Sequence, residues 1–150
     1  YGVDDHGFTT HAAFFDYDND GDLDLYILNN SYLSIESFNL MKVERPNRDK
    51  LGGDKLLRND NGKFVDVTSE AGIFGSVIGF GLGVTVGDIN KDGWQDIYVS
   101  NDFFERDYLY INQRDGTFKE QLTKRIFHGR RSGRHQQRHV AGYFCNRHVA

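Results

Sequence analysis

Oxygen-bearing side chains stand at alternate positions in two short stretches of the chain, a spacing that suits a metal ion. Residues 16–24, here called the first acidic loop, and residues 88–96, the second acidic loop, each have a glycine at the sixth position. The candidate ligands at positions 1, 3, 5, 7 and 9 are Asp16, Asp18, Asp20, Asp22 and Asp24 in the first loop and Asp88, Asn90, Asp92, Trp94 and Asp96 in the second. Alternate oxygen ligands around a glycine that permits a sharp turn are what a hard cation of the size of calcium requires. The spacing therefore predicts two Ca2+ sites.

The seventh position is Asp22 in one loop and Trp94 in the other, which favours a backbone carbonyl as the ligand there. An EF-hand is excluded, because its bidentate Glu at position 12 is replaced by Ile27 and Val99. Without a cation, the neighbouring carboxylates would repel one another and some would take up protons. An Asp- and Asn-rich turn without metal is the alternative, and two loops in the same register argue against it.

The elements that position these loops belong to an internal repeat with a constant offset of 72 residues. Residues 7–29 read GFTTHAAFFDYDNDGDLDLYILN, and residues 79–101 read GFGLGVTVGDINKDGWQDIYVSN. A second matched pair follows, DKLLRNDNGKF at 54–64 and DYLYINQRDGTF at 107–118, each with the Asn/Asp/Gly turn of a β-hairpin. Each unit is thus a strand leading into an acidic loop, a second strand (23–28 or 97–100) and a hairpin. The repeat predicts an all-β fold with about four short strands per unit.

One connection differs between the two units. It spans residues 31–53 in the first unit and only 102–106 in the second. Insertions in repeat proteins lie on one exposed face, often the binding face. A tolerated surface loop without a role is the alternative interpretation.

Composition and charge limit the possible partners. The chain has 150 residues, of which 38% are hydrophobic, and no apolar run approaches the roughly 20 residues that span a bilayer. All 22 acidic residues lie in residues 1–120 with 11 of the 18 basic ones, a formal charge of −11. Such a body repels nucleic acid and membrane surfaces and favours cations. The single cysteine, Cys145, excludes an intrachain disulfide.

The motifs resemble a known family. The pattern GF-x7-D-x-[DN]-x-D-G-x-x-D-[IL]-Y, followed by D-x-L-x-x-N and G-x-F, is similar to the FG-GAP/VCBS repeat of integrin-α-like β-propellers. Two segments resemble the propeller part of ASPIC/UnbV-type (cartilage acidic protein-like) proteins: HGFTTHAAFFDYDNDGDLDLYILNN and GKFVDVTSEAGI. The resemblance covers residues 1–125.

This resemblance implies a fragment of a β-propeller: about two four-stranded blades, with calcium loops between blade strands. It also implies the remaining blades elsewhere in a longer chain, because two blades cannot close a propeller. The expected role is adhesion or the binding of a protein or glycan, without catalysis. The expected location is extracellular, at the cell surface or periplasmic, where calcium is near millimolar.

The basic segment 126–150 differs from everything before it. Seven of the chain's basic residues follow Glu120, and no acidic residue does. An arm that binds nucleic acid is one interpretation. The sequence favours another: read one base later, the codons permit a third acidic-loop segment, which indicates a frameshift near Arg125. We therefore expect this tail to be irregular or disordered, and we expect no nucleic-acid partner.

Other groups could carry chemistry. Glu36 and Glu44, in the long connection, are the candidate acids of the alternative function, a polysaccharide lyase or hydrolase built on a propeller. His6 and His11 have no match in the second unit, so polar positions at a strand end are the simpler account. The glycines of residues 75–83 lack GK[ST], which favours close packing between blades over a phosphate loop. Trp94, Tyr98, Phe103 and Phe104 could form a ligand platform or pack between blades.

Overall fold

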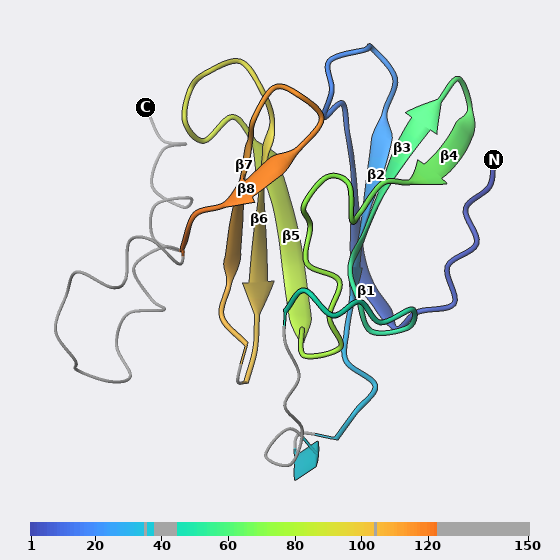
Figure 1. The fold of residues 1–150 in the computed structure, drawn as a ribbon, viewed down its shortest axis with the longest axis vertical. Coiled ribbons are helices and arrows are strands. Elements are labelled where there is room, and N and C mark those ends of the chain that lie inside the picture. Colours follow the sequence, from blue (N-terminus) through green and yellow to red (C-terminus); the bar gives the residue numbers. More distant parts are fainter. Residues whose placement is uncertain (35, 38–44, 104, 123–150) are drawn as a thin grey trace, which may run out of the picture.

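The computed structural model describes residues 1–34, 36–37, 45–103 and 105–122, which form two four-stranded antiparallel sheets (Figure 1). The first sheet contains, in spatial order, β1 (Thr9–Phe15), β2 (Asp24–Asn29), β3 (Lys55–Asp60) and β4 (Lys63–Asp66). The second contains β5 (Gly81–Gly87), β6 (Asp96–Asn101), β7 (Tyr108–Asn112) and β8 (Phe118–Glu120). We call each sheet with its loops a blade. The predicted all-β fold with two four-stranded blades is confirmed.

The two blades repeat one another down to the register of their strands. Ala13 pairs with Tyr26 between β1 and β2, and Thr85 pairs with Tyr98 at the same offset between β5 and β6. Both first strands also have an irregular register at the same place, between Thr9 and His11 and between Gly81 and Gly83. The sequence repeat therefore encodes strand pairing and not only strand content.

The blades pack face to face, with the edge strands β1 and β5 side by side (Figure 1). The shared core draws on side chains from both sheets. Its most deeply buried members, which have no exposed surface, are Tyr26, Leu28, Leu56, Ile97, Val99 and Tyr110. Two hydrogen bonds join the edge strands: Thr10 Oγ1 donates to Gly81 O at 2.8 Å, and Val84 N–H donates to His11 Nδ1 at 3.2 Å. The acidic loops thus rest on one common core.

The start of the chain covers part of the opposite face of the first blade. Leu25, Ile27 and Leu57 are buried there, and Phe64 packs against them. Tyr1 O accepts a hydrogen bond of 2.7 Å from Phe64 N–H, and Lys55 forms an ion pair with Asp5. Strand β2 is consequently buried on both faces along its whole length.

The glycine-rich run 75–83 packs closely between the blades, as expected. A Cβ on Gly81 would lie 2.5 Å from Cδ1 of Leu28, and one on Gly53 would lie 2.0 Å from Gly75 O. Only glycine fits such contacts without displacing its neighbours. The run contributes to packing between the blades.

The long connection leaves the end of β2, and its last residues return to the space between the blades. Asp49 N–H donates to Gly75 O at 2.7 Å, so this part of the connection is tied to the segment that enters β5. Glu44 and the tail 126–150 lie outside the described residues. Within the part that is described, no helix has the length and hydrophobicity needed to cross a membrane.

Candidate metal centre

Both acidic loops lie at the same end of the sheets, where β1 turns into β2 and β5 turns into β6 (Figure 1). Gly21 has a φ of 94° and Gly93 a φ of 88°, the left-handed conformation that side chains rarely adopt. Asn19 and Lys91, at position 4 of their loops, also have positive φ. The turn predicted from the glycine at position 6 is therefore formed in both loops.

The aspartate at position 1 closes each loop onto itself. Asp16 accepts hydrogen bonds from the N–H groups of Asp20 and Gly21, at 3.1 and 3.0 Å. Asp88 accepts the same two bonds from Asp92 and Gly93, at 2.9 and 2.8 Å. Because these bonds use one lone pair of each oxygen, the carboxylates retain capacity for a cation.

The aspartate at position 9 of the first loop is buried and connects the loop to the sheet. Asp24 Oδ2 accepts the N–H of Tyr17 at 3.0 Å, and its Oδ1 accepts the N–H of Asn59, on β3, at 2.8 Å. Asp24 is 0% exposed, and burial raises its pKa to about 6, although both N–H bonds oppose this rise. The two bonds therefore compensate only in part for the burial of the charged form.

Position 9 of the second loop repeats this arrangement. Asp96 Oδ2 accepts the N–H of Ile89 at 2.9 Å, and Oδ1 accepts the N–H of Asn112, on β7, at 2.9 Å. Burial also raises the pKa of Asp96. The ninth aspartate is thus a structural residue in both blades as well as a candidate ligand.

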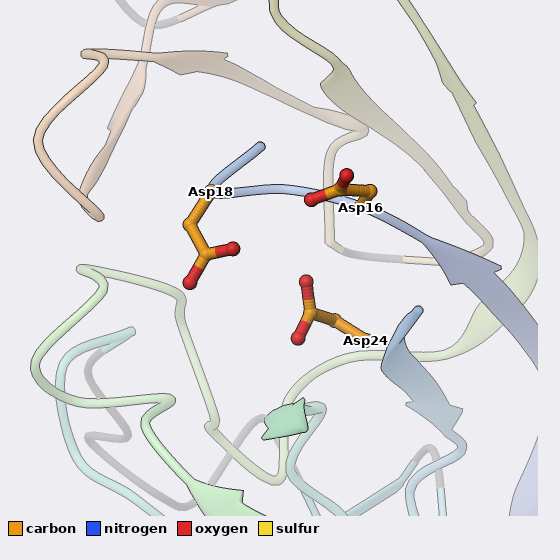
Figure 2. Close-up of side chains that lie close together, drawn as sticks. All are labelled: Asp16, Asp18 and Asp24. Carbon is orange, nitrogen blue, oxygen red and sulfur yellow. The ribbon is translucent and has the colours of Figure 1, made fainter. Parts of the chain in front are cut away.

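Three carboxylates of the first loop converge, those of Asp16, Asp18 and Asp24 (Figure 2). One oxygen of each lies within 4.8 Å of the others. Oδ1 of Asp18 is buried and has no hydrogen-bond partner among the described residues. Burial and the charges of Asp20 and Asp16 raise the pKa of Asp18. A buried carboxylate oxygen without a donor, beside two further carboxylates, fits a bound cation.

Asp20 and Asp22, also predicted as ligands, do not belong to this group of three. Asp20 is exposed, and its Oδ1 accepts the N–H of Asp22 at 2.8 Å. Asp22 is partly buried. The group of three thus contains positions 1, 3 and 9 of the predicted set, and it includes no side chain from position 5 or 7.

The second loop holds its charges differently. Asn90 replaces an acid at position 3, and its Nδ2 donates to Asp92 Oδ2 at 2.9 Å. The guanidinium of Arg114, in the β7–β8 hairpin, lies 3.0 Å from the same oxygen. Burial tends to raise the pKa of Asp92, but hydrogen bonds from Trp94, Asn90 and Arg114 lower it below its usual range. The side chain of Trp94 is partly buried.

Comparison with protein families places the second acidic loop in a known repeat. The model of the FG-GAP-like repeat matches residues 47–99 and residues 88–137. The chain belongs to the FG-GAP-like repeat family. A search of curated proteins finds no match.

The first FG-GAP-like match runs from the long connection through β3 and β4 of one blade into β5 and β6 of the next. The second match begins at Asp88, the first position of the second acidic loop. The family repeat is therefore offset from the sheets, so that one repeat joins two neighbouring blades. An offset of this kind makes each blade depend on its neighbour.

Sequence reasoning missed three residues that organise the two acidic loops. The backbone N–H groups of Asn59 and Asn112 donate hydrogen bonds to the aspartates at position 9 of the two loops. Both residues are the final Asn of the D-x-L-x-x-N motif, which is the signal that could have identified them. No sequence signal pointed to Arg114. It stands two residues after Asn112, but the matching position of the first unit, two residues after Asn59, is Asn61, so the repeat does not preserve the arginine. Only the fold brings its side chain to the second loop.

The other candidate residues are separate from the acidic loops. His6 forms an exposed ion pair with Asp4, and His11 accepts the bond from Val84 described above. Glu36 is exposed. The Tyr98 hydroxyl donates to Asp107, and Phe103 packs edge-on against Phe80 with ring centroids 5.0 Å apart. Phe104 lies outside the described residues, like Glu44.

Proposed function

We propose that this chain is a calcium-stabilised part of a β-propeller whose role is to bind a protein or glycan outside the cytoplasm. The observation that carries the proposal is the convergence of Asp16, Asp18 and Asp24, with the buried Oδ1 of Asp18 lacking a donor. The membership in the FG-GAP-like repeat family supports it. Calcium would neutralise the loop, and these residues would hold it.

The donor set supports calcium in preference to a transition metal. All candidate side-chain ligands of the first loop are carboxylate oxygens, which suit hard cations. The loop is already shaped by the bonds from Asp20 and Gly21 to Asp16, so that binding would require little rearrangement. A cation there would offset both the burial and the repulsion that raise the pKa of Asp18.

The two blades support a propeller that continues in a longer protein. Two sheets packed face to face leave an outer face on each, and propellers close with at least four blades. The remaining blades are the partners that we propose for these faces. Within the family, the sequence of residues 6–30 supports a relationship to ASPIC/UnbV-type proteins.

The end of the sheets opposite the acidic loops supports a binding role. Phe8 and Tyr32 stack there with ring centroids 6.0 Å apart, and they are 54% and 43% exposed. Phe103, at the matching end of the second blade, is 55% exposed. Exposed aromatic side chains beside the long connection suit a protein or glycan ligand. No residue of this end is proposed to catalyse a reaction.

Thermal unfolding of the intact chain with and without calcium tests the proposal. Calcium loops of extracellular modules bind with dissociation constants of about 0.1–1 mM. A concentration of about 10 mM should then stabilise the folded state by about 1.5–3 kcal/mol and raise the midpoint by several degrees. Asp18→Asn should abolish the increase. Asp22→Asn, which retains the predicted carbonyl ligand, is the matched control and should preserve it.

The selectivity of the effect is part of the test. Magnesium at the same concentration should stabilise less, because it demands shorter and more regular coordination. A midpoint that is the same in calcium and in EDTA would contradict the proposal. So would an equal calcium response in the wild type and in Asp18→Asn.

A further inference from the structure

The two acidic loops share their backbone conformation but differ in charge. Residues 16–24 contain five acidic residues and no basic one, whereas residues 88–96 contain three acidic residues and Lys91. In the described part of the chain, no Lys or Arg forms an ion pair with a carboxylate of the first loop. The second loop has such a partner in Arg114.

Arg114 contacts the second loop at Asp92, the position-5 side chain that the sequence predicts as a cation ligand. Its Nη2 lies 3.0 Å from Asp92 Oδ2, and its Nε donates to the same oxygen at 3.2 Å. Asn90 Nδ2 donates to that oxygen as well, at 2.9 Å. Three N–H donors therefore surround the carboxylate at position 5, and its other oxygen accepts the N–H of Trp94.

The backbone of Arg114 is fixed by the same network that fixes the loop. Arg114 N–H donates to Asn112 Oδ1 at 2.8 Å, and Asn112 N–H donates to Asp96 Oδ1 at 2.9 Å. The arginine is thus tied to the ninth position of the loop by its main chain and to the fifth position by its side chain. These two attachments hold the Arg114 side chain in place, although 54% of it is exposed.

The first blade lacks an equivalent contact. Asn61 stands two residues after Asn59, as Arg114 stands two residues after Asn112, and both have positive φ. The nearby Arg58 directs its guanidinium to Asp60, with Nε 2.7 Å from Oδ1, and its charge opposes the rise in the pKa of Asp18 that burial causes, without forming an ion pair with it. The hairpin of the second blade has one additional residue, and Arg114 lies in that hairpin.

We propose that the guanidinium of Arg114 takes the place of a cation at the second loop. This inference rests on the proposed binding of calcium by the first loop. The first loop then binds the ion that stabilises the chain, whereas the second is held by a charge that the protein itself supplies. Calcium that took Asp92 as a ligand would have to displace Arg114 from it. The two repeats therefore differ in calcium affinity despite their common motif.

Calcium titration calorimetry of the folded chain, with three proteins, tests this assignment. The wild type should bind one ion, at the first loop, in the range of about 0.1–1 mM expected above. Arg114→Asn should bind a second ion, with the affinity of the second loop raised on the order of tenfold by loss of the competing charge. Asparagine suits this position because it tolerates positive φ. The matched control is Lys91→Asn, which removes the same charge from the loop, keeps the ion pair and reproduces Asn19 of the first loop.

Terbium, a luminescent substitute for calcium, identifies the loop that gains the ion. Trp94 is the only tryptophan and lies within the second loop, so that terbium emission excited through its indole reports binding there. In an Asp18→Asn background, which disables the first loop, emission should be weak. It should rise when Arg114→Asn is added, and it should change by less than about threefold with Lys91→Asn.

The outcomes separate the two proposals. Two ions of equal affinity in the wild type would overturn the role of Arg114 and leave the first loop as a calcium site. An equal gain in Lys91→Asn and Arg114→Asn would also overturn it, because general charge would then explain the effect. Failure of every variant to bind calcium would overturn both proposals. Circular dichroism of each variant shows that the blades remain folded.

Discussion

The Tyr26 hydroxyl donates a hydrogen bond of 2.9 Å to Asp54 Oδ2 inside the protein core, and the Tyr98 hydroxyl makes the matching bond to Asp107 in the second blade. Oδ1 of Asp54 accepts the N–H of Asn29, just as Oδ1 of Asp107 accepts that of Asn101. Each aspartate therefore joins the end of the second strand to the start of the third. The two bonds stabilise the blade at the end opposite its acidic loop.

Stability should fall with rising pH because of Asp54. Burial raises the pKa of Asp54 to about 7, although the bonds from Asn29 and Tyr26 lower it, whereas an unfolded aspartate titrates near about 3.9. The folded state thus binds the proton more tightly. This contribution to stability is complete below about pH 4 and is lost as the pH rises through about 7.

Urea unfolding at several pH values between about 5 and 8, in excess calcium, measures this effect. Asp54→Asn should flatten the pH dependence of the unfolding free energy. Asp107→Asn, at the matched but less buried position, is the control. A pH dependence that is unchanged in Asp54→Asn would show that another group is responsible.

Asp24→Asn should destabilise the chain even when calcium is absent. The carboxylate accepts N–H bonds on both oxygens, from Tyr17 and Asn59, and an amide can accept on only one. The expected loss in EDTA is about 1–3 kcal/mol by urea unfolding. Asp18→Asn, by comparison, should be neutral or stabilising in EDTA, since Asp18 Oδ1 has no hydrogen-bond partner. Equal losses in both variants would contradict this division of roles.

Asn112→Ala should loosen the contact between the blades. Its Nδ2 donates to Tyr17 O, in the first loop, at 2.7 Å, so that a residue of β7 supports the neighbouring blade's loop. The expected cost is about 1–3 kcal/mol, because Tyr17 O is left buried without its donor. The calcium affinity of the first loop should decrease as well.

Asn59→Ala provides the matched comparison for this prediction. Asn59 Nδ2 donates to Leu23 O within its own blade, in an exposed position, at 3.1 Å. Its loss should cost less than that of Asn112, with calorimetry showing a smaller change in calcium affinity. The opposite order of the two variants would refute a link between the blades through Asn112.

Gly81→Ala should be strongly destabilising. The new Cβ would lie 2.5 Å from Cδ1 and Cγ of Leu28, in the buried contact between the blades, and overpacking of this kind costs about 1–3 kcal/mol. Gly83→Ala is the control, because the nearest atom, Ser100 Oγ, lies at an ordinary 3.5 Å. Thermal unfolding compares the two. Adding Leu28→Ala to Gly81→Ala should relieve part of the clash, so that the double variant loses less stability than the sum of the two single losses. Strictly additive losses would contradict a clash with Leu28.

The sequence by itself determined the repeat, the strands and the loop conformation. Glycines at position 6 have the expected positive φ, and the offset of 72 residues reappears in the pairing of Ala13 with Tyr26 and of Thr85 with Tyr98. Such features are local, because turn geometry and strand alternation depend on residues within a few positions of one another. The position-1 and position-9 aspartates were identified for the same reason.

Only the tertiary structure decided which residues from elsewhere in the chain contact each loop. Arg114 reaches Asp92 across 22 positions of the chain, and Asn112 reaches Tyr17 across 95. The high pKa of Asp54 likewise depends on burial between strands and not on its neighbours in sequence. Charge pairing and desolvation depend on distances between elements that packing brings together, and no spacing in a single segment encodes those distances. The same motif can therefore have an arginine partner in one blade and converging carboxylates in the next.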